Sequence, residues 1–371
     1  MWKCEEEKRC KDVVWLVPVG KGVKMFEKNA APLLHLAGIV VNIVKTEYEG
    51  QVKQLLTVLE KEHTDAIVVA GGDGTLLETV TGMMRKRNNQ KFCQAVPVGV
   101  IPLGQQNRFA TLLFGEDPNQ VKFIMNASMA IIKSVIKPVD VLEIKAEDGK
   151  NTYAMSGLQL GVYNDAETRK TKYWYFGPLK SYWTYLRTAM KKWPPAVTLN
   201  VEYVPSSADL TIKKVVASSE KKQVKKWSLF NFLYKSKMPD LSYVEEYEIE
   251  DKDWIQEQMS TIELTVTSST YQTDNLGASI LDIGIGPALP EKSSVIKEGW
   301  SRAKHRRLKL GSQENNHLKA YKLKLSPEIE EGEELWYNVD GEAFEARPIE
   351  ISIIKKQLQM FHPPESVISY I

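Results

Sequence analysis

One short run limits what this chain can fold into more than any other feature of its sequence. Apolar residues 66–70 lead into three glycines placed around one aspartate, Gly71-Gly72-Asp73-Gly74-Thr75, and a helical pattern begins at Leu76. A buried strand that turns through glycines directly into a helix is typical of a parallel sheet. Glycines also remove the Cβ atoms that would keep the backbone away from a ligand. The run therefore predicts a phosphate-binding turn.

Two interpretations of this turn compete. Thr75 followed by Glu78 reads as a capping box, so a well-capped strand–turn–helix junction explains both residues. It does not explain three glycines around an acid, because one glycine would make the turn. An aspartate among phosphate-binding amides is expected to handle Mg²⁺ or to accept the proton of an attacking hydroxyl. Asp73 is therefore the predicted catalytic residue, and the predicted phosphate-binding residues of this run are Gly71, Gly72, Gly74, Thr75 and Glu78.

The 371 residues suffice for two domains. After a charged tail at residues 1–12, short apolar runs alternate with helical patterns, which predicts an α/β domain with a mostly parallel sheet over residues 13–137. From residue 138 the pattern is mainly β, with one clear helix near 178–192. This predicts a mainly antiparallel β-sandwich domain over residues 138–371, with a polar insertion at about 204–253.

Composition excludes several classes of protein. A net charge of +2 is not that of a nucleic-acid-binding polycation, so no nucleic-acid partner is expected. Three cysteines cannot build a disulfide framework, and no apolar run reaches the roughly 18 residues of a membrane span. The first residues read as neither a signal peptide nor a mitochondrial presequence. Both the P-loop motif and the dinucleotide motif G-x-G-x-x-G are absent.

The glycine run, continued by Leu76-Leu77-Glu78, resembles the signature of the diacylglycerol kinase catalytic superfamily, which includes sphingosine and ceramide kinases. Further segments are similar to its acylglycerol kinase branch, namely residues 26–32, 45–50, 172–180 and 259–264. The likeness extends from about residue 13 to about residue 361. It implies a two-domain kinase that binds ATP and Mg²⁺ between its domains and phosphorylates monoacylglycerol and diacylglycerol to lysophosphatidic and phosphatidic acid.

The resemblance also implies a compartment and a partner. It places the protein at the mitochondrial inner membrane, facing the intermembrane space, and links it to the carrier-protein import machinery. Two alternatives stay open, a membrane-associated assembly module with weak or no kinase activity and a sphingosine- or ceramide-type lipid kinase. A NAD kinase also uses a Gly-Gly-Asp-Gly loop, but Phe109-Ala110 and the aromatic helix after Asp165 favour a lipid acceptor.

Residues carry over from the family one at a time. Asp73 matches its catalytic aspartate, whose role as general base is worth roughly 10²–10⁴-fold in rate. Gly104 and Asn107 keep the superfamily's Gly-Thr-x-Asn-Asp segment beside the nucleotide, whereas Gln105 and Arg108 replace its threonine and its second acid.

Three acids in the predicted second domain are also candidates. Asp165 lies where the family places an acid near the acceptor head group, although an aspartate there could be an N-cap or turn residue. Asp340-Gly341-Glu342 resembles the family's late Asp-Gly-Glu, whose acids reach the metal and the nucleotide. Taken alone, Asp-Gly is a favourable hairpin turn.

The start of the chain departs from the family. The family opens with an asparagine and a glycine-rich basic loop, whereas here Val17 takes the place of the asparagine and the loop is shorter. Gly20 and Gly22 are expected to approach phosphate, with Lys21 as counter-charge. The missing asparagine favours the assembly module.

Three segments suggest surface roles. Residues 225–237 mix aromatic and basic side chains and predict either an interfacial helix or a helix packed on the second domain. Residues 173–186 place apolar side chains at helical spacing, which fits either core packing or an acyl-chain wall. The basic run at residues 302–309 reads as a solvated face.

Overall fold

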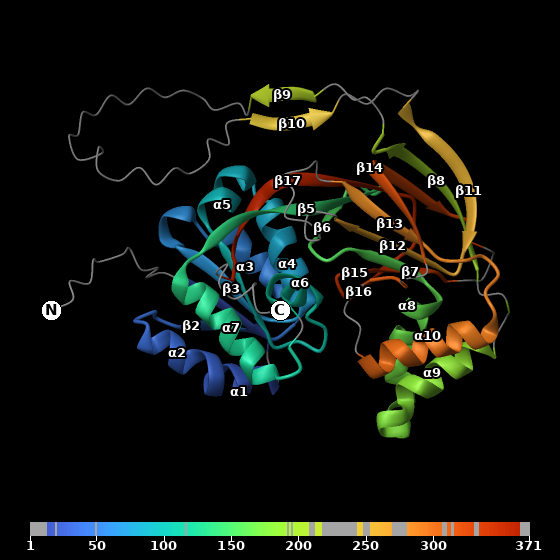
Figure 1. Cartoon of the computed structure of the whole chain (residues 1–371). Helices are drawn as coiled ribbons and strands as arrows, with labels where there is room; N and C mark the ends of the chain where they lie inside the picture. The colour runs from blue at the N-terminus through green and yellow to red at the C-terminus, as the bar shows by residue number, and fades with distance from the viewer. Residues whose placement is uncertain are drawn as a thin grey trace.

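The computed structural model describes residues 13–18, 21–48, 50–115, 117–190, 193, 196–207, 212–216, 243–247, 253–268, 280–305, 310–312, 315–329 and 334–363. Figure 1 shows two lobes, with the N-terminal helices and strands in one and most of the antiparallel strands in the other. Both lobes share one 15-stranded hydrogen-bonded sheet. None of the described helices is long and apolar enough to cross a membrane.

Four parallel strands form the centre of the first lobe, in the order β4-β3-β1-β2. They are β1 (Val13–Pro18), β2 (Asn42–Thr46), β3 (Ala66–Gly71) and β4 (Val98–Pro102). Every residue of β3 and β4 is buried, which explains why the sequence reads there as continuous rather than alternating apolar runs. The predicted parallel α/β architecture is confirmed.

Helices cover this sheet. They are α1 (Lys21–Met25), the π-helix Phe26–Ala30, α2 (Ala31–Leu36), α3 (Gln51–Val58), the 3₁₀ turn Lys61–His63, α4 (Asp73–Met84), α5 (Asn89–Ala95), α6 (Arg108–Phe114) and α7 (Gln120–Lys133). The sequence patterns missed α5, α6 and α7. Their apolar side chains, Phe109 among them, join the main core with Trp15 and Met83.

The second lobe is antiparallel, as predicted. Its strands are β5 (Ile136–Ala146), β6 (Asn151–Ala154), β7 (Leu158–Gly161), β8 (Val197–Pro205), β11 (Ile255–Thr261), β12 (Glu263–Ser268), β13 (Leu281–Ile285), β14 (Asn316–Pro327), β15 (Trp336–Val339), β16 (Glu342–Glu345) and β17 (Ile349–Phe361). Its helices are α8 (Val162–Arg169), the 3₁₀ segment Lys170–Leu179, α9 (Lys180–Ala189) and α10 (Lys292–His305).

Within the predicted polar insertion, β9 (Ile212–Val216) and β10 (Tyr243–Tyr247) form a separate antiparallel ribbon. The proposed interfacial segment at residues 225–237 lies outside the described residues.

Strand β17 joins the two lobes. It pairs antiparallel with β14 and β5, and its end pairs parallel with β4 at Met360 and Val98. Met360 and Phe361 are buried in the core of the first lobe. The C-terminal strand therefore ties the antiparallel lobe to the parallel sheet (Figure 1).

Two sequence interpretations are wrong. Helix α4 begins at Asp73 with Gly72 as N-cap, and Glu78 accepts a hydrogen bond from the Gly50 amide at 2.7 Å, so Thr75 and Glu78 form no capping box. The helix starts two residues before Thr75, directly after β3 ends at Gly71 and the extended N-cap Gly72. The basic run at 302–309 is not simply a solvated face, because the Arg302 side chain is only 11% exposed and is ion-paired.

Candidate phosphoryl-transfer site

Asp73 lies at the junction of two helices. It begins α4, and its buried carboxylate accepts hydrogen bonds from the backbone amides of Arg108 at 2.8 Å and Phe109 at 3.1 Å. Burial raises the pKa of Asp73, while these two amides and the charge of Arg108 act to lower it. The net rise makes the carboxylate a stronger base than an exposed aspartate.

The turn around Asp73 packs against the turn that follows β4. The amide of Asp73 donates to the carbonyl of Gln106 at 3.2 Å, and the amide of Leu103 donates to that of Gly71 at 3.0 Å. A Cβ on Gly104 would lie only 2.2 Å from the Cα of Gly72. Gly72 and Gly104 are thus required by this backbone contact, quite apart from any ligand. Both turns follow neighbouring parallel strands, at the edge where open α/β sheets bind ligands.

Asn107 closes the second turn. Its side-chain amide donates to the carbonyl of Gly104 at 2.9 Å, and its side-chain oxygen accepts from the Gly104 amide at 3.1 Å. Both functional groups of this side chain are therefore used within the turn. Gly104 and Asn107, two predicted nucleotide contacts, hold the shape of the loop beside Asp73.

Asp340 occupies a hairpin turn, as the simpler interpretation of Asp-Gly predicts. Strands β15 and β16 pair up to Val339 and Glu342, and the two turn residues have φ values of 48° and 90°, as in a type I′ turn. The Asp340 carboxylate is buried and accepts from three successive amides, those of Met155 at 2.6 Å, Ser156 at 2.8 Å and Gly157 at 3.0 Å.

The fold brings this hairpin onto the Asp73 turn. A Cβ built on Gly74 would lie 2.0 Å from Oε1 of Glu342, and one on Gly341 would lie 3.0 Å from Oε1 of Gln106. Burial raises the pKa of Asp340 to about 6, and the nearby charge of Asp73 adds to the rise. The predicted catalytic acid and the predicted metal-binding acids, far apart in sequence, therefore lie together.

Two buried oxygens at this junction lack partners. Among the described residues, no hydrogen-bond donor reaches Oε1 of Gln106 or Oγ of Ser156. Nearly all buried polar atoms in folded proteins are hydrogen-bonded, so these two oxygens are open to a hydrogen bond from a polar ligand.

The same atoms fit Mg²⁺. This ion takes oxygen ligands and is commonly held by one or two carboxylates together with substrate phosphates. In the described part of the chain, no group of three or more His, Cys, Asp or Glu residues could hold a metal alone. Asp340 and Glu342 with the orphan oxygens therefore suit an ion that arrives with a nucleotide.

The remaining candidates lie on three elements. Lys21 and Gly22 begin α1 just beyond β1, and a Cβ on Gly22 would lie 3.4 Å from the Leu103 side chain, whereas Gly20 is outside the described residues. Thr75 is in the first turn of α4. Asp165 lies in the first turn of α8, where its carboxylate is 3.8 Å from Arg169. The N-cap of α8 is Gly161, so the N-cap interpretation of Asp165 is wrong.

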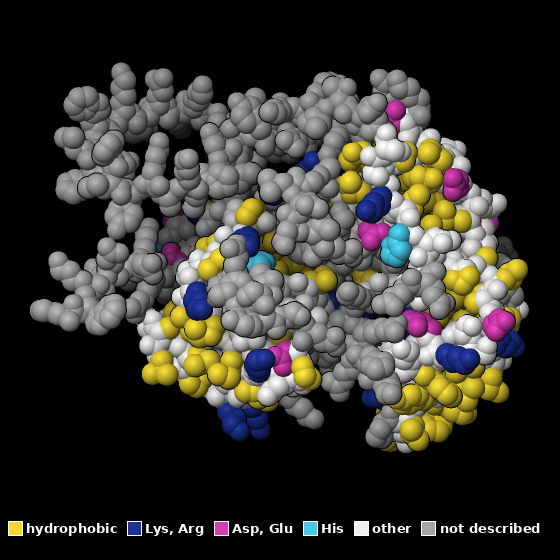
Figure 2. Space-filling model, viewed as in Figure 1, with side chains coloured by type: hydrophobic (Ala, Val, Ile, Leu, Met, Phe, Trp, Pro, Cys, Tyr) yellow, Lys and Arg dark blue, Asp and Glu magenta, His cyan; other side chains and the backbone are white. Residues whose placement is uncertain are grey.

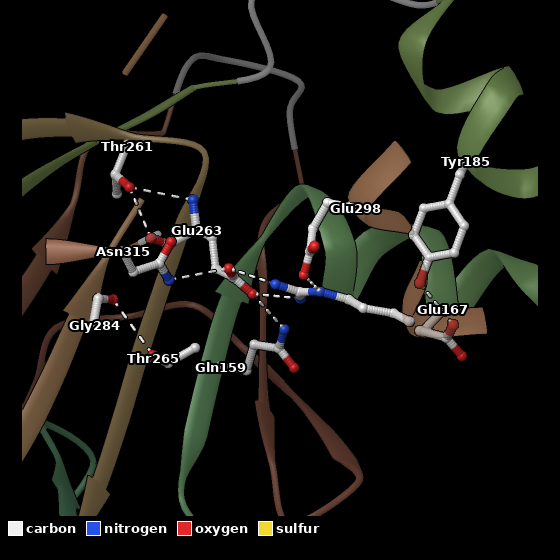
Figure 3. A network of polar contacts seen from close by, with 10 residues as sticks. Gln159, Glu167, Tyr185, Thr261, Glu263, Thr265, Gly284, Glu298 and Asn315 are labelled. Atoms are coloured by element: carbon white, nitrogen blue, oxygen red, sulfur yellow. Dashed lines mark hydrogen bonds and ion pairs between the residues drawn. The ribbon is translucent and has the colours of Figure 1, made fainter. Parts of the chain in front are cut away.

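A second polar network stiffens the lobe that carries Asp165 (Figure 3). Buried Glu263 accepts two hydrogen bonds from Arg302, at 2.7 and 2.9 Å, and one each from Gln159 and Asn315. The Arg302 guanidinium also lies 3.9 Å from the ring centre of Tyr163 on α8. These contacts tie α10 to β12 and α8.

Sequence reasoning missed Gln106, Ser156 and the Arg302–Glu263 pair. Gln106 lies between Gln105 and Arg108, the two positions that depart from the family pattern. That departure was the signal in the sequence that could have drawn attention to Gln106. Neither Ser156 nor the Arg302–Glu263 pair has a local signal, because each depends on residues far away in the sequence.

Comparison with solved structures shows the fold. A putative diacylglycerol kinase from Bacillus anthracis str. Sterne superimposes with a TM-score of 0.56 at 16% identity, covering 97% of this chain and 100% of that one. The diacylglycerol kinase catalytic domain family matches residues 19–144, and the acylglycerol kinase C-terminal family matches residues 155–368.

Curated relatives give the same result. "Acylglycerol kinase, mitochondrial" of Pongo abelii is 37% identical over 361 residues, and that of Homo sapiens is 36% identical over the same length, each covering 95% of this chain and 83% of the relative. Sphingosine kinase 1 of Rattus norvegicus is 26% identical over 178 residues, covering 46% of each chain. Fold and sequence together define a lipid kinase with a diacylglycerol kinase catalytic domain. Within that class, the chain belongs to the acylglycerol kinase family.

Proposed function

We propose that this chain transfers the γ-phosphoryl group of ATP to a hydroxyl of monoacylglycerol or diacylglycerol, giving lysophosphatidic or phosphatidic acid. The observation that carries the proposal is the meeting of the Asp73 turn with the Asp340 hairpin around two unpartnered buried oxygens. Membership of the acylglycerol kinase family supports this choice of acceptor.

In the proposed reaction, the acceptor hydroxyl oxygen attacks the γ-phosphorus and forms a new P–O bond. The bond from that phosphorus to the β,γ-bridging oxygen breaks, and ADP leaves with the electron pair. The hydroxyl proton passes to the carboxylate of Asp73, which its two backbone amide donors hold in place. General-base catalysis of this kind contributes roughly 10²–10⁴-fold in rate.

The other candidates take supporting roles. Gly71, Gly72 and Gly74 let the phosphates approach the backbone. Lys21, the first residue of α1, is assigned as their counter-charge. Asp340 and Glu342 would hold Mg²⁺, which when bound neutralises phosphate charge. Asp165 is assigned to the acceptor hydroxyls, and its partly exposed carboxylate on α8 supports that role.

A transfer assay tests the proposal. Purified protein receives Mg²⁺ and ATP labelled in its γ-phosphate, together with monoacylglycerol, diacylglycerol, sphingosine or NAD in parallel reactions. The expected result is labelled lysophosphatidic and phosphatidic acid, with little label in the other two products. Label found mainly in sphingosine phosphate or NADP, or in no product at all, would contradict it.

A lipid substrate has to be met at a membrane surface, and we propose the 3₁₀ segment Lys170–Leu179 as the contact. Trp174 is 76% exposed, Tyr175 62% and Leu179 63%, so core packing does not account for them. Exposed Lys172 on this segment and exposed Arg187 on α9, which follows it, would meet anionic headgroups. In Figure 2, hydrophobic side chains gather where Figure 1 places α9 and α10. The segment continues directly from α8, which carries Asp165.

Vesicle binding tests this contact. The variant Trp174→Ser/Leu179→Ser is compared with Leu36→Ser/Val40→Ser, which removes two exposed apolar side chains from the other lobe. Only the first variant is expected to lose sedimentation with vesicles that contain an anionic phospholipid. Equal binding by both variants would rule out the segment as the contact.

The names of the relatives support a choice of compartment. Their names are mitochondrial, which supports a mitochondrial site of action. We place the proposed reaction at the inner membrane, on the side of the intermembrane space, where the relevant test is protease protection in isolated mitochondria and mitoplasts.

A second candidate function is that of an assembly module for inner-membrane carrier import. The observation that favours it is Val17, which is fully buried in the core and supplies no polar group where the family has an asparagine. Mitochondria that contain only the Asp73→Asn variant separate the two functions. Normal carrier import would support the assembly module, and import lost together with lipid phosphorylation would contradict it.

A further inference from the structure

Arg108 is an unusual cation at the candidate site. It is the first residue of α6, where its backbone amide is fixed by Asp73 at 2.8 Å. Its side chain is only partly exposed, yet among the described residues no acceptor lies within hydrogen-bond or ion-pair distance of the guanidinium. Buried arginines are normally paired, and this one keeps all five N–H donors of its side chain available.

Three acids act electrostatically on the Arg108 guanidinium without a hydrogen bond or ion pair to it. Burial lowers the pKa of Arg108, while the charges of Asp73, Asp340 and Glu167 act to raise it and that of Arg302 acts to lower it.

Each of these acids is already engaged elsewhere. Asp73 accepts from the amides at residues 108 and 109, Asp340 from those at residues 155–157, and Glu167 from Tyr185 and Lys170. The charges of these three acids act on the guanidinium, and among the described residues its own hydrogen bonds are unmade.

We propose that the Arg108 side chain binds the phosphoryl group that is being transferred, first as the terminal phosphate of ATP and then as the phosphomonoester of the lipid product. A planar guanidinium matches two phosphate oxygens at once, and such pairs are among the strongest hydrogen bonds in proteins. Unpartnered Oε1 of Gln106 and Oγ of Ser156 mark the same junction as a place for a polar ligand.

This assignment rests on the proposed kinase function and adds a residue to it. A phosphoryl group brings negative charge to a place that already holds Asp73 and Asp340, so a cation is needed there. Arg108 stands where the superfamily pattern has an acid, and this chain thereby supplies positive charge from its own α6. Stabilising charge on the transferred group is the main electrostatic task in phosphoryl transfer.

Equilibrium binding of ATP and ADP tests the first half of the proposal, with no acceptor present. The variant Arg108→Gln removes the charge, Arg108→Lys keeps it without the planar fork, and Arg87→Gln makes the same change at an exposed arginine of the same lobe. Arg108→Gln is expected to weaken ATP binding about tenfold or more relative to ADP, as loss of a charged hydrogen bond predicts. Arg108→Lys is expected to restore part of that difference, and Arg87→Gln to leave it unchanged.

Binding of the lipid product distinguishes its phosphomonoester from the terminal phosphate of ATP as the group that Arg108 binds. Arg108→Gln is expected to weaken binding of micellar lysophosphatidic acid while monoacylglycerol binding stays as in the unaltered chain. An unchanged ratio of ATP to ADP affinity together with unchanged lysophosphatidic acid binding overturns the proposal, and a change in only one arm confines Arg108 to that ligand.

A failure of the proposed kinase function is detected by a different measurement from a failure of the Arg108 assignment. Unaltered protein that binds ATP but labels no acylglycerol refutes the proposed reaction, whereas the ATP-to-ADP ratio still reports on Arg108.

Discussion

The Asp73 turn in the first lobe and the Asp340 hairpin in the second lobe are built in the same way. Each places a buried carboxylate beside glycine and uses it to hold backbone amides of a second loop, at residues 108–109 and 155–157 respectively. The charges around them differ. Arg108 acts to lower the pKa of Asp73, whereas Asp73 itself helps to raise that of Asp340 to about 6.

This difference indicates how the roles are divided. Both acids are loop clamps, so an Asp-Gly pattern alone does not identify a catalytic residue. Asp73, whose pKa Arg108 acts to lower, can stay ionised as a base, while Asp340, whose pKa burial and Asp73 raise to about 6, is available to share a cation brought by the substrate. The assignment of chemistry to Asp73 therefore depends on its neighbours more than on its sequence motif.

The largest effect is expected from filling the space behind the Asp73 turn. In Gly104→Ala the new methyl group would meet backbone atoms of Gly72 at 2.2 and 2.7 Å, so the two turns must separate. We expect a loss of about 3 kcal/mol or more in the free energy of unfolding, measured by denaturant titration. Gly22→Ala is the control, because its Cβ makes only an ordinary 3.4 Å contact. Equal stability of the two variants would show that the turns are not in contact.

A pH series separates the two acids. Because the folded pKa of Asp340 is about 6 and its ordinary value is 3.8, its contribution to stability is fully present below about pH 4 and is lost as the pH rises through about 6. In metal-free buffer, the unfolding free energy of the unaltered chain should fall by about 3 kcal/mol relative to Asp340→Asn between these limits. The unfolding free energy of Asp148→Asn, a change at an exposed turn, should depend on pH in the same way as that of the unaltered chain. Parallel curves for Asp340→Asn would contradict the raised pKa.

The smallest effect on stability is expected where the two regions touch. In Gly74→Ala the methyl group would meet the tip of the Glu342 side chain, which can rotate away, so stability should change by less than about 1 kcal/mol. Affinity for ATP in the presence of Mg²⁺ should fall because Glu342 is displaced. A double-mutant cycle tests whether the loss of ATP affinity arises through Glu342. Gly74→Ala should then have no further effect on this affinity in a Glu342→Ala background. An undiminished effect in that background would show that Glu342 is not involved.

The sequence predicts those features that are encoded locally. Continuous apolar runs at β3 and β4 reveal the parallel sheet because those strands are buried on both faces. The hairpin at Asp340-Gly341 follows from the positive φ angles that an Asp-Gly pair accepts. The meeting of Asp73 with Asp340 was expected only through the resemblance to a kinase family.

Other features have no local signature. The start of α4 at Asp73 depends on where β3 ends, and a capping box at Thr75 was an equally regular pattern. Strand β17 reads as an ordinary strand, although its last residues belong to the first lobe. Arg302 looked solvated because its partner Glu263 lies 39 residues away in sequence, and that pairing exists only in the folded chain. Arg108 attracted notice as a departure from the family pattern, but its setting among acids is a property of the tertiary fold.

We expect the Asp73 carboxylate to accept the proton of the acceptor hydroxyl in this lipid kinase site. The most direct measurement is the rate of phosphoryl transfer from labelled ATP to monoacylglycerol by Asp73→Asn, with Asp148→Asn as a matched control at an exposed aspartate. Asp73→Asn is expected to lose at least about 100-fold in rate with ATP binding retained, and the control to keep the rate of the unaltered chain. An Asp73→Asn variant that transfers phosphate as fast as the unaltered chain would contradict it.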